Sequence, residues 1–333
     1  EDVDTFVSEC NKENIDAIVV ATVTEKPNLV MHWNGETIVD LERSFLDTNG
    51  VRVVVDAKVV DKDVKLPEER TTSAESLETD LLALLSDLNH ASQKGLQTIF
   101  DSSVGGSTVN HPLGGRYQIT PTEASVQKLP VQSGFTNTAS VIAQGFHPYL
   151  AEWSPYHGAA YAVIEATARL VAAGGEWSKA RFSYQEYFER MDKKAERFGQ
   201  PVSALLGSIE AQIQLGLPSI GGKDSMSGTF EELTVPPTLV AFGVTTADTR
   251  KVLSPEFKAV GEWIYYIPGS ALSQEIDFET VKANFTQFAS LQNEYAISAA
   301  SAVKYGGVLE SLALMSMGNR IGAKVKLTDL STC

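Results

Sequence analysis

One stretch of the sequence is so rich in alanine and branched apolar residues that a helix formed from it must be buried on most of its sides. It covers residues 156–173, follows Ser154-Pro155 and is followed by Gly174-Gly175. Serine before proline is a usual helix start, and glycine is a usual helix stop. The pattern therefore predicts a helix that belongs to the core of an α/β protein rather than to its surface.

Two charged residues interrupt this apolar helix. Glu165 and Arg169 are four residues apart, so a helix places them on the same face. On a solvated face they would form an ordinary ion pair worth a few tenths of a kcal/mol. In a buried helix each charge instead needs a partner, which makes both residues candidates for a functional site.

A second feature is the glycine-rich stretch 217–230, in which Gly221-Gly222-Lys223-Asp224-Ser225 follows a short apolar run. Glycines let backbone N–H groups approach an anion, the lysine adds a positive charge, and the aspartate can bind a metal or a donor. The spacing is not that of a Walker A loop. The stretch is therefore either a phosphate-binding loop or a polar turn between a helix and a strand.

Size and composition limit the class of protein. The chain has 333 residues, of which 43% are hydrophobic and 21% charged, enough for two domains. No apolar run reaches the roughly 18 residues of a membrane span, and no signal peptide precedes Glu1, so we expect a cytoplasmic location and no membrane partner. The net charge of −15 argues against a nucleic-acid partner.

The two cysteines, Cys10 and Cys333, lie near opposite ends of the chain. Their spacing indicates neither a disulfide framework nor a zinc site. A nucleophilic Cys10 would need a histidine and an orienting group close by in space, and no motif in the sequence provides them.

Hydrophobic periodicity and turn residues predict the remaining elements. We expect strands over 15–24, 28–33, 36–40, 51–60, 118–131, 138–144, 238–246, 263–267 and 323–327. We expect helices over 2–14, 76–89, 156–173, 184–198, 202–215, 278–288, 294–301 and 308–317. The charged segment 61–78 is predicted to be a linker.

The chain resembles the phosphoribosylformylglycinamidine synthase family in three segments and in their order. These segments are 156–175, 217–230 and 234–244. The resemblance covers about residues 86–325. It implies a ferredoxin-like, partly β-barrel α/β domain of the aminoimidazole ribonucleotide synthetase type over 88–250, with partial flanking domains. Residues 1–60 would end a preceding domain, 61–87 would be a linker with an entry helix, and 251–333 would start the following domain.

The resemblance also implies an activity. The family converts formylglycinamide ribonucleotide, ATP and glutamine-derived ammonia to formylglycinamidine ribonucleotide in purine biosynthesis, as an ATP-dependent carbon–nitrogen ligase. The expected partners are the other domains of the same enzyme, among them the first synthetase half and the glutaminase domain. No catalytic residue is expected in this part, which alone should be inactive. The alternatives are a degenerate nucleotide-binding scaffold and a standalone binding module unrelated to purine synthesis.

The resemblance assigns roles to individual residues. It implies that Gly221, Gly222, Lys223, Asp224 and Ser225 bind the phosphates of ATP or ADP. Glu165 matches a metal ligand of the family, and Asp101 lies where relatives have a carboxylate that reaches Mg²⁺. A cap of the following turn is the alternative role of Asp101.

The sequence departs from the family at two places near this expected metal site. Arg169 replaces an asparagine, and in the segment 301–307 Ala302, Lys304 and Tyr305 replace an aspartate, a serine and a second aspartate. A metal ligand is lost and two cations appear. We therefore expect Arg169 and Lys304 to contribute to the phosphate site and take over charge that Mg²⁺ supplies in relatives.

Overall fold

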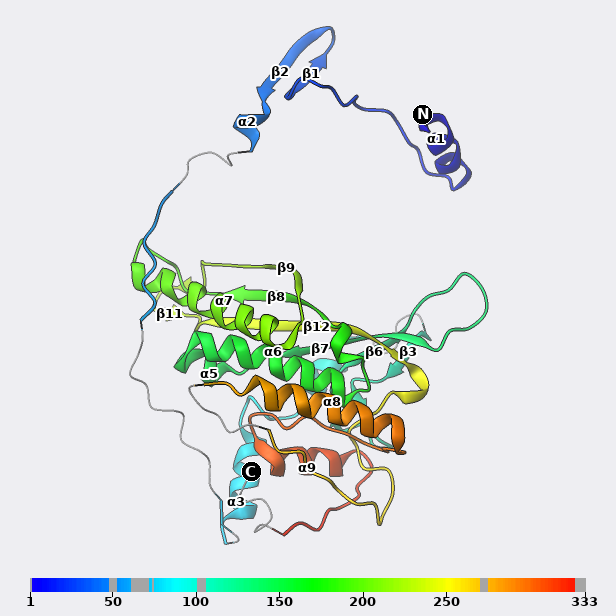
Figure 1. Cartoon of the computed structure of the whole chain (residues 1–333), viewed down its shortest axis with the longest axis vertical. Coiled ribbons are helices and arrows are strands. Elements are labelled where there is room, and N and C mark those ends of the chain that lie inside the picture. The colour runs from blue at the N-terminus through cyan, green and yellow to red at the C-terminus, as the bar shows by residue number, and fades with distance from the viewer. Residues whose placement is uncertain are drawn as a thin grey trace. The chain divides into compact units, whose positions relative to one another are not determined.

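The structure of the chain is a computed structural model that describes residues 2–47, 53–60, 72–73, 75–100, 106–269 and 275–326 (Figure 1). The chain divides into two compact units, Glu1–Val55 and Asp56–Cys333. No helix in the described ranges has both the length and the apolar character needed to cross a membrane.

The first unit contains a helix and a hairpin. Helix α1 covers Val3–Lys12, strands β1 (Asn28–Trp33) and β2 (Glu36–Glu42) pair antiparallel, and the short helix α2 covers Arg43–Leu46. The tight turn lies at Asn34-Gly35, where both residues have positive φ angles, as the Asn-Gly sequence predicts. Residues 15–24 form no strand, contrary to expectation. Their pattern favours strand, but no neighbouring described strand pairs with them, so propensity alone is insufficient.

The second unit is built around one sheet and three long helices. Its strands are β3 (Thr108–Asn110), β4 (Leu113–Gly114), β5 (Thr120–Pro121), β6 (Ser125–Lys128), β7 (Thr138–Gly145), β8 (Arg181–Tyr187), β9 (Ser219–Lys223), β10 (Thr229–Phe230), β11 (Leu233–Thr234) and β12 (Thr238–Asp248). Its helices are α3 (Leu77–Ser86), α4 (Lys94–Gln97), α5 (Pro148–Trp153), α6 (Pro155–Ala172), α7 (Ala195–Leu215), α8 (Phe278–Glu294) and α9 (Gly307–Met317).

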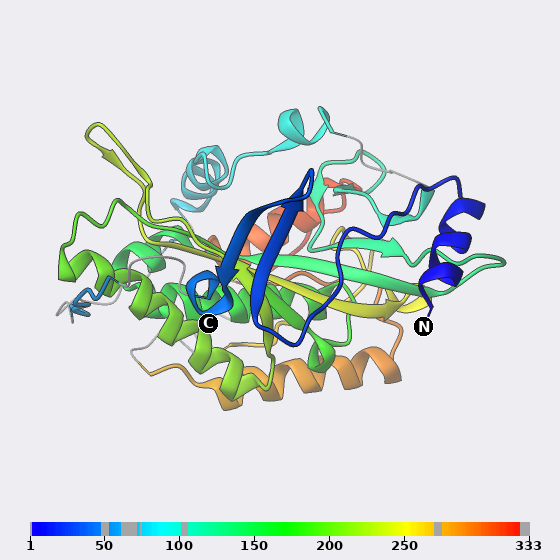
Figure 2. The same ribbon diagram turned by 90° about the horizontal axis from the view of Figure 1, so that it is seen from above.

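The sheet has the strand order β3-β6-β7-β12-β8-β9. All neighbours are antiparallel except β8 and β9, which are parallel. Helix α6 packs on β7 and β12, α7 packs against α6, and α8 packs against both helices (Figures 1 and 2). This mixed α/β architecture confirms the fold class expected from the sequence.

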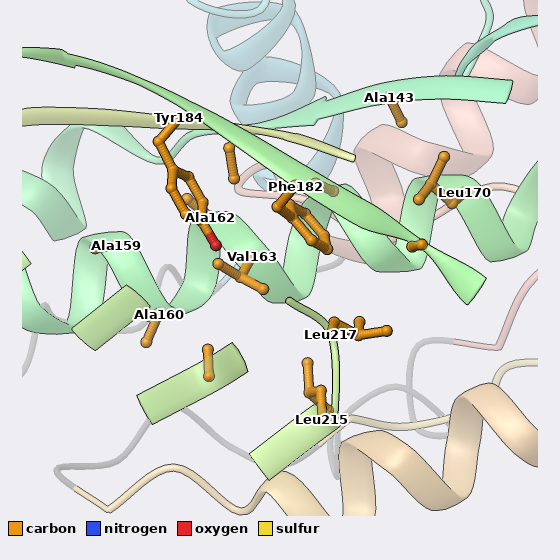
Figure 3. Packing of buried hydrophobic residues seen from close by; sticks show 14 of the residues in the cluster. Ala143, Ala159, Ala160, Ala162, Val163, Leu170, Phe182, Tyr184, Leu215 and Leu217 are labelled. Carbon is orange, nitrogen blue, oxygen red and sulfur yellow. The ribbon is translucent and has the colours of Figure 1, made fainter. Parts of the chain in front are cut away.

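The core lies between α6 and the sheet. Phe182 and Tyr184 of β8 point towards α6 at Ala162 and Val163 (Figure 3). Small side chains on α6 allow this close packing, since ten of its residues are buried and five of those are alanines. The predicted buried helix is confirmed, and its alanines are the reason that it can lie so near the sheet.

The opposite face of the sheet is largely open among the described residues. Side chains alternate along each strand, and those that point away from α6 include Ile142, Tyr187 and Val244, each about two-fifths exposed. Figure 2 shows the strands running side by side across this unit. Polar residues such as Ser140 and Gln185 lie between these side chains, so the face mixes apolar and polar groups, as docking surfaces for another part of a protein commonly do.

The prediction of a helix over 184–198 was wrong. Residues 181–187 are strand β8, and α7 begins only at Ala195. Charges at 186, 189, 190 and 192–194 imitate helical spacing, but Phe182, Tyr184 and Glu186 alternate into the core as strand residues do. Tertiary packing against α6 therefore decided the conformation.

Four further expected elements differ from the structure. Residues 263–267 pair with no described strand, and residues 295–301 are held in a non-helical form by contacts with other segments, among them the hydrogen bond of Ser301 to Glu123. Helix α3 forms as predicted, yet none of its leucines is fully buried. The strand expected over 51–60 is absent over 53–60, and the one over 323–327 is absent over 323–326, the rest of both lying outside the described residues.

Candidate functional site

Four charged side chains from three parts of the second unit meet beside the end of β7. They are Glu123, which lies just before β6, Glu165 and Arg169 on α6, and Lys304, which lies just before α9. We call these four residues the charge cluster. The side chains are 3%, 19%, 18% and 23% exposed respectively, so none of the charges is freely solvated.

Glu123 is the centre of the charge cluster. Its carboxylate accepts hydrogen bonds from Lys304 Nζ at 3.0 and 3.3 Å and from Ser301 Oγ at 2.7 Å. Arg169 Nε lies 3.4 Å from the same carboxylate and donates to the Glu123 backbone carbonyl at 3.1 Å. A buried carboxylate is stable only with such partners, and here several donors share the role.

Arg169 links the two carboxylates. Its Nη1 lies 3.5 Å from Glu165 Oε1 and donates to the Gln144 carbonyl at 3.0 Å. Burial raises the pKa of Glu165, and the nearby Glu123 raises it further, whereas Arg169, Lys304 and the Phe146 amide lower it. The i, i+4 spacing noted in the sequence thus produces a real pair, held in a part of the protein that is mostly buried.

The implied Mg²⁺ does not fit these residues. Mg²⁺ needs oxygen ligands at about 2.0–2.1 Å in octahedral geometry. The carboxylates of Glu123 and Glu165 already have cationic partners, and their charges are balanced by Arg169 and Lys304. Within the described residues, no group of three or more His, Cys, Asp and Glu side chains is placed to hold a metal ion. Asp101, the other predicted ligand, lies outside the described residues.

The glycine-rich stretch forms an exposed edge strand. All five residues of β9, among them Gly221, Gly222 and Lys223, are exposed. β9 pairs with β8 on one side and ends the sheet on the other, so a row of its backbone N–H groups is unpaired in the sheet. Gly222 passes closely over β8, because a Cβ there would lie 2.7 Å from the Tyr184 carbonyl oxygen.

The side chains at the end of β9 and just after it are also accessible. Lys223 Nζ lies 5.3 Å from the centre of the Tyr187 ring, and no described carboxylate forms an ion pair with it. Asp224 is exposed. Burial is the main cause that raises the pKa of Glu186, and the negative charge of Asp224 raises it further. The Ser225 carbonyl accepts from the Phe188 amide at 2.8 Å, and its hydroxyl lies 3.4 Å from Ser227 Oγ. This loop can therefore offer amides, a cation and hydroxyls to an anion.

The structure places the predicted residues in two groups. Gly145, Ala241, Tyr184 and Gly222 are neighbours across four adjacent strands. Arg169 binds the carbonyl of Gln144, next to Gly145, and the Gly145 backbone is about 14 Å from the Gly222 backbone at the ordinary strand spacing. Arg169 and Lys304 thus lie together, but Lys223 is not with them.

Sequence reasoning missed Glu123 of the charge cluster and Ser301, which donates a hydrogen bond to it. Glu123 follows Thr122 in a polar turn, where a glutamate gives no sign of burial. Ser301 does lie beside Ala302 and Lys304, in the segment that departs from the family pattern, so its position carried some signal. Only the fold brings both residues to the end of α6.

Comparison with known proteins supports the resemblance. No model of a known protein family matches the chain. The chain is 26% identical over 340 residues to the phosphoribosylformylglycinamidine synthase subunit PurL of Picrophilus torridus, which covers 96% of this chain and 44% of that protein. It is also 26% identical to the PurL subunit of Thermoplasma volcanium, over 99% of this chain and 45% of that protein.

Solved structures show the same fold. Thermotoga maritima PurL complexed with ATP superposes with a TM-score of 0.54 and 16% identity, over 88% of this chain and 42% of that one. The same protein complexed with FGAR gives a TM-score of 0.55, over 93% of this chain and 44% of that one. The chain therefore spans about half the length of the relatives that it matches, and it has the PurL type of fold.

Proposed function

We propose that this chain, a homologue of about half of the PurL subunit, is the central part of a phosphoribosylformylglycinamidine synthase. In the proposed reaction ATP transfers its terminal phosphoryl group to the amide oxygen of formylglycinamide ribonucleotide, and glutamine-derived ammonia then displaces phosphate. The support is the similarity to PurL over nearly the whole chain. The proposal retains the division into 1–60, 61–87, 88–250 and 251–333 and a cytoplasmic location.

The proposal includes a nucleotide-phosphate site at residues 221–225. The observation that carries it is the exposed edge strand β9, which combines unpaired backbone amides with the ammonium of Lys223. Amides and a cation to which the described part of the chain gives no carboxylate partner attract an anion, even in a chain with a net charge of −15. ATP or ADP is the anion that the PurL similarity favours, and Mg²⁺ would arrive with the nucleotide.

Calorimetric titration of the chain with ADP, in EDTA and in Mg²⁺, tests this site. Lys223→Ala should weaken binding by about 1–3 kcal/mol, the scale of a charge-assisted hydrogen bond. Lys179→Ala is the control, because Lys179 is an exposed lysine paired with Glu176 before the start of β8, whereas Lys223 lies at the far end of β9. Equal ADP affinity in the wild-type protein and in Lys223→Ala would contradict the site.

The partners in this proposal are the other domains of the same enzyme, among them the first synthetase half and the glutaminase domain. The open sheet face supports such partners, since Ile142, Tyr187 and Val244 are partly exposed on it and a neighbouring domain would cover them. It follows that the isolated chain should show no synthase activity with ammonia as nitrogen donor. Turnover above the blank, with ATP and formylglycinamide ribonucleotide supplied, would contradict this.

A structural scaffold without chemistry of its own is the second candidate. The charge cluster favours it, because Arg169 and Lys304 are engaged by Glu123 and Glu165 and are not free to bind phosphate. The scaffold predicts no ADP binding by a chain that still unfolds cooperatively. The ADP titration therefore separates the two candidates.

A further inference from the structure

The charge cluster raises the question of what neutralises its two carboxylates. Glu123 and Glu165 come from different segments, and both are largely buried. Two carboxylates that share a buried region need positive charge between or beside them, and either a metal ion or basic side chains can supply it.

The positive charge present is that of Arg169 and Lys304. Arg169 lies between the carboxylates, at 3.4 Å from Glu123 and 3.5 Å from Glu165. Lys304 reaches both oxygens of Glu123 from the segment before α9. Two negative and two positive groups give the cluster no net charge. A divalent cation that entered it would be repelled at close range by the guanidinium of Arg169 and the ammonium of Lys304.

Further hydrogen bonds hold the side chains of the cluster. Ser301 Oγ donates to Glu123, and the Phe146 amide donates to Glu165. Arg169 donates to two backbone carbonyls, those of Glu123 and Gln144, and Lys304 donates to the Ala302 carbonyl at 3.3 Å. These bonds fix the basic groups in place, so that they are not displaced easily by a hydrated ion.

We propose that Arg169 and Lys304 replace a metal ion in this cluster, which makes it a metal-independent ion-pair site that holds residues 301–304 on the sheet. Glu165 then serves as a positioning residue for Arg169 and not as a metal ligand. The inference is independent of the nucleotide site proposed at β9, since that site lies on the edge strand, three strands from the end of β7 beside which the charge cluster lies.

Mn²⁺ binding, followed by electron paramagnetic resonance without nucleotide, tests the inference. In the wild-type chain and in Glu165→Gln, the same amount of Mn²⁺ should bind, because any bound ion occupies other acidic surfaces. EDTA and millimolar Mg²⁺ should leave the wild-type unfolding midpoint unchanged. A Mn²⁺ site present in the wild type and lost in Glu165→Gln, or a midpoint lowered by EDTA, would overturn the inference.

The converse experiment removes the basic groups. The double variant Arg169→Asn, Lys304→Met leaves Glu123 and Glu165 without cations, so it should bind Mn²⁺ at least about tenfold more tightly than the wild type. Mg²⁺ should also restore part of its lost stability. Unchanged Mn²⁺ affinity in a folded double variant would overturn the inference. If the double variant does not fold, the comparison of wild type with Glu165→Gln decides by itself.

Discussion

Lys304 Nζ and Glu123 Oε1 lie 3.0 Å apart although 181 residues separate them in the chain. This contact joins the segment before α9 to the turn before β6, and Ser301 adds a second bond to the same carboxylate. The C-terminal part of the second unit is therefore tied to the sheet by a carboxylate that is almost completely buried.

Lys304→Met should destabilise the second unit by about 3 kcal/mol, because the buried carboxylate of Glu123 loses one of its two basic partners and keeps only the more distant Arg169. Urea unfolding of the variant and the wild type measures the difference. Lys179→Met is the control, since the Glu176–Lys179 pair is exposed and should contribute less than about 1 kcal/mol. Equal losses in the two variants would show that Glu123 does not depend on Lys304.

Gly145→Ala should destabilise the protein by about 2–3 kcal/mol through overpacking. A Cβ at this position would overlap the Ala162 carbonyl oxygen and lie 2.6 Å from the Ala166 amide, so α6 would have to move away from β7. Gly95→Ala is the matched control, because nothing lies near its Cβ position in helix α4. Thermal unfolding of both variants checks this, and a neutral Gly145→Ala would contradict the close contact.

The sequence was sufficient to predict a helix or strand where its local signals agree with its tertiary packing. Helix α6 has a serine cap, a proline in its first turn and an apolar surface, and the structure begins and ends it within one residue of the predicted limits. β8 was not predictable in the same way. Its aromatic residues alternate into the core, as in a strand, but the charges that follow have helical spacing. The packing of Phe182 on α6 decides in favour of the strand.

The candidate site was predictable only in part. The spacing of Glu165 and Arg169 on one helix face is a local property, so their pair was visible in the sequence. The contact of Lys304 with Glu123 depends on how distant segments pack, and no local pattern encodes it. Because that contact was not foreseen, Arg169 and Lys304 were expected beside the glycine-rich stretch. The fold instead places them near β7, three strands away from β9.

Val244→Glu should reduce self-association of the chain. Val244 lies opposite Ile142 on the open sheet face, and Arg181 on its other side can accommodate a glutamate. Apolar side chains on an uncovered sheet favour association, and a charge there opposes it. Sedimentation velocity over a range of concentrations measures the effect. Phe135→Glu, in an exposed loop, is the control and should change association less than Val244→Glu does.

The buried side chain of His147 makes the stability of the fold depend on pH in the acid range. Burial is the main cause that lowers the pKa of His147 from 6.5 to about 4, and His90 contributes. The unfolded chain therefore binds a proton between about pH 6.5 and pH 4 that the folded chain does not bind, so stability falls as the pH is lowered through this window. His147 Nδ1 also accepts from the Leu150 amide at 3.1 Å, as the cap of α5.

His147→Asn retains an acceptor for this cap but cannot take up the proton. We expect the variant to lose less stability than the wild type between pH 6.5 and pH 4 in urea titrations at fixed ionic strength. His111→Asn, at an exposed loop position, should keep the wild-type pH dependence. The interpretation fails if His147→Asn and the wild type lose stability in parallel over this range, because the titrating group would then lie elsewhere.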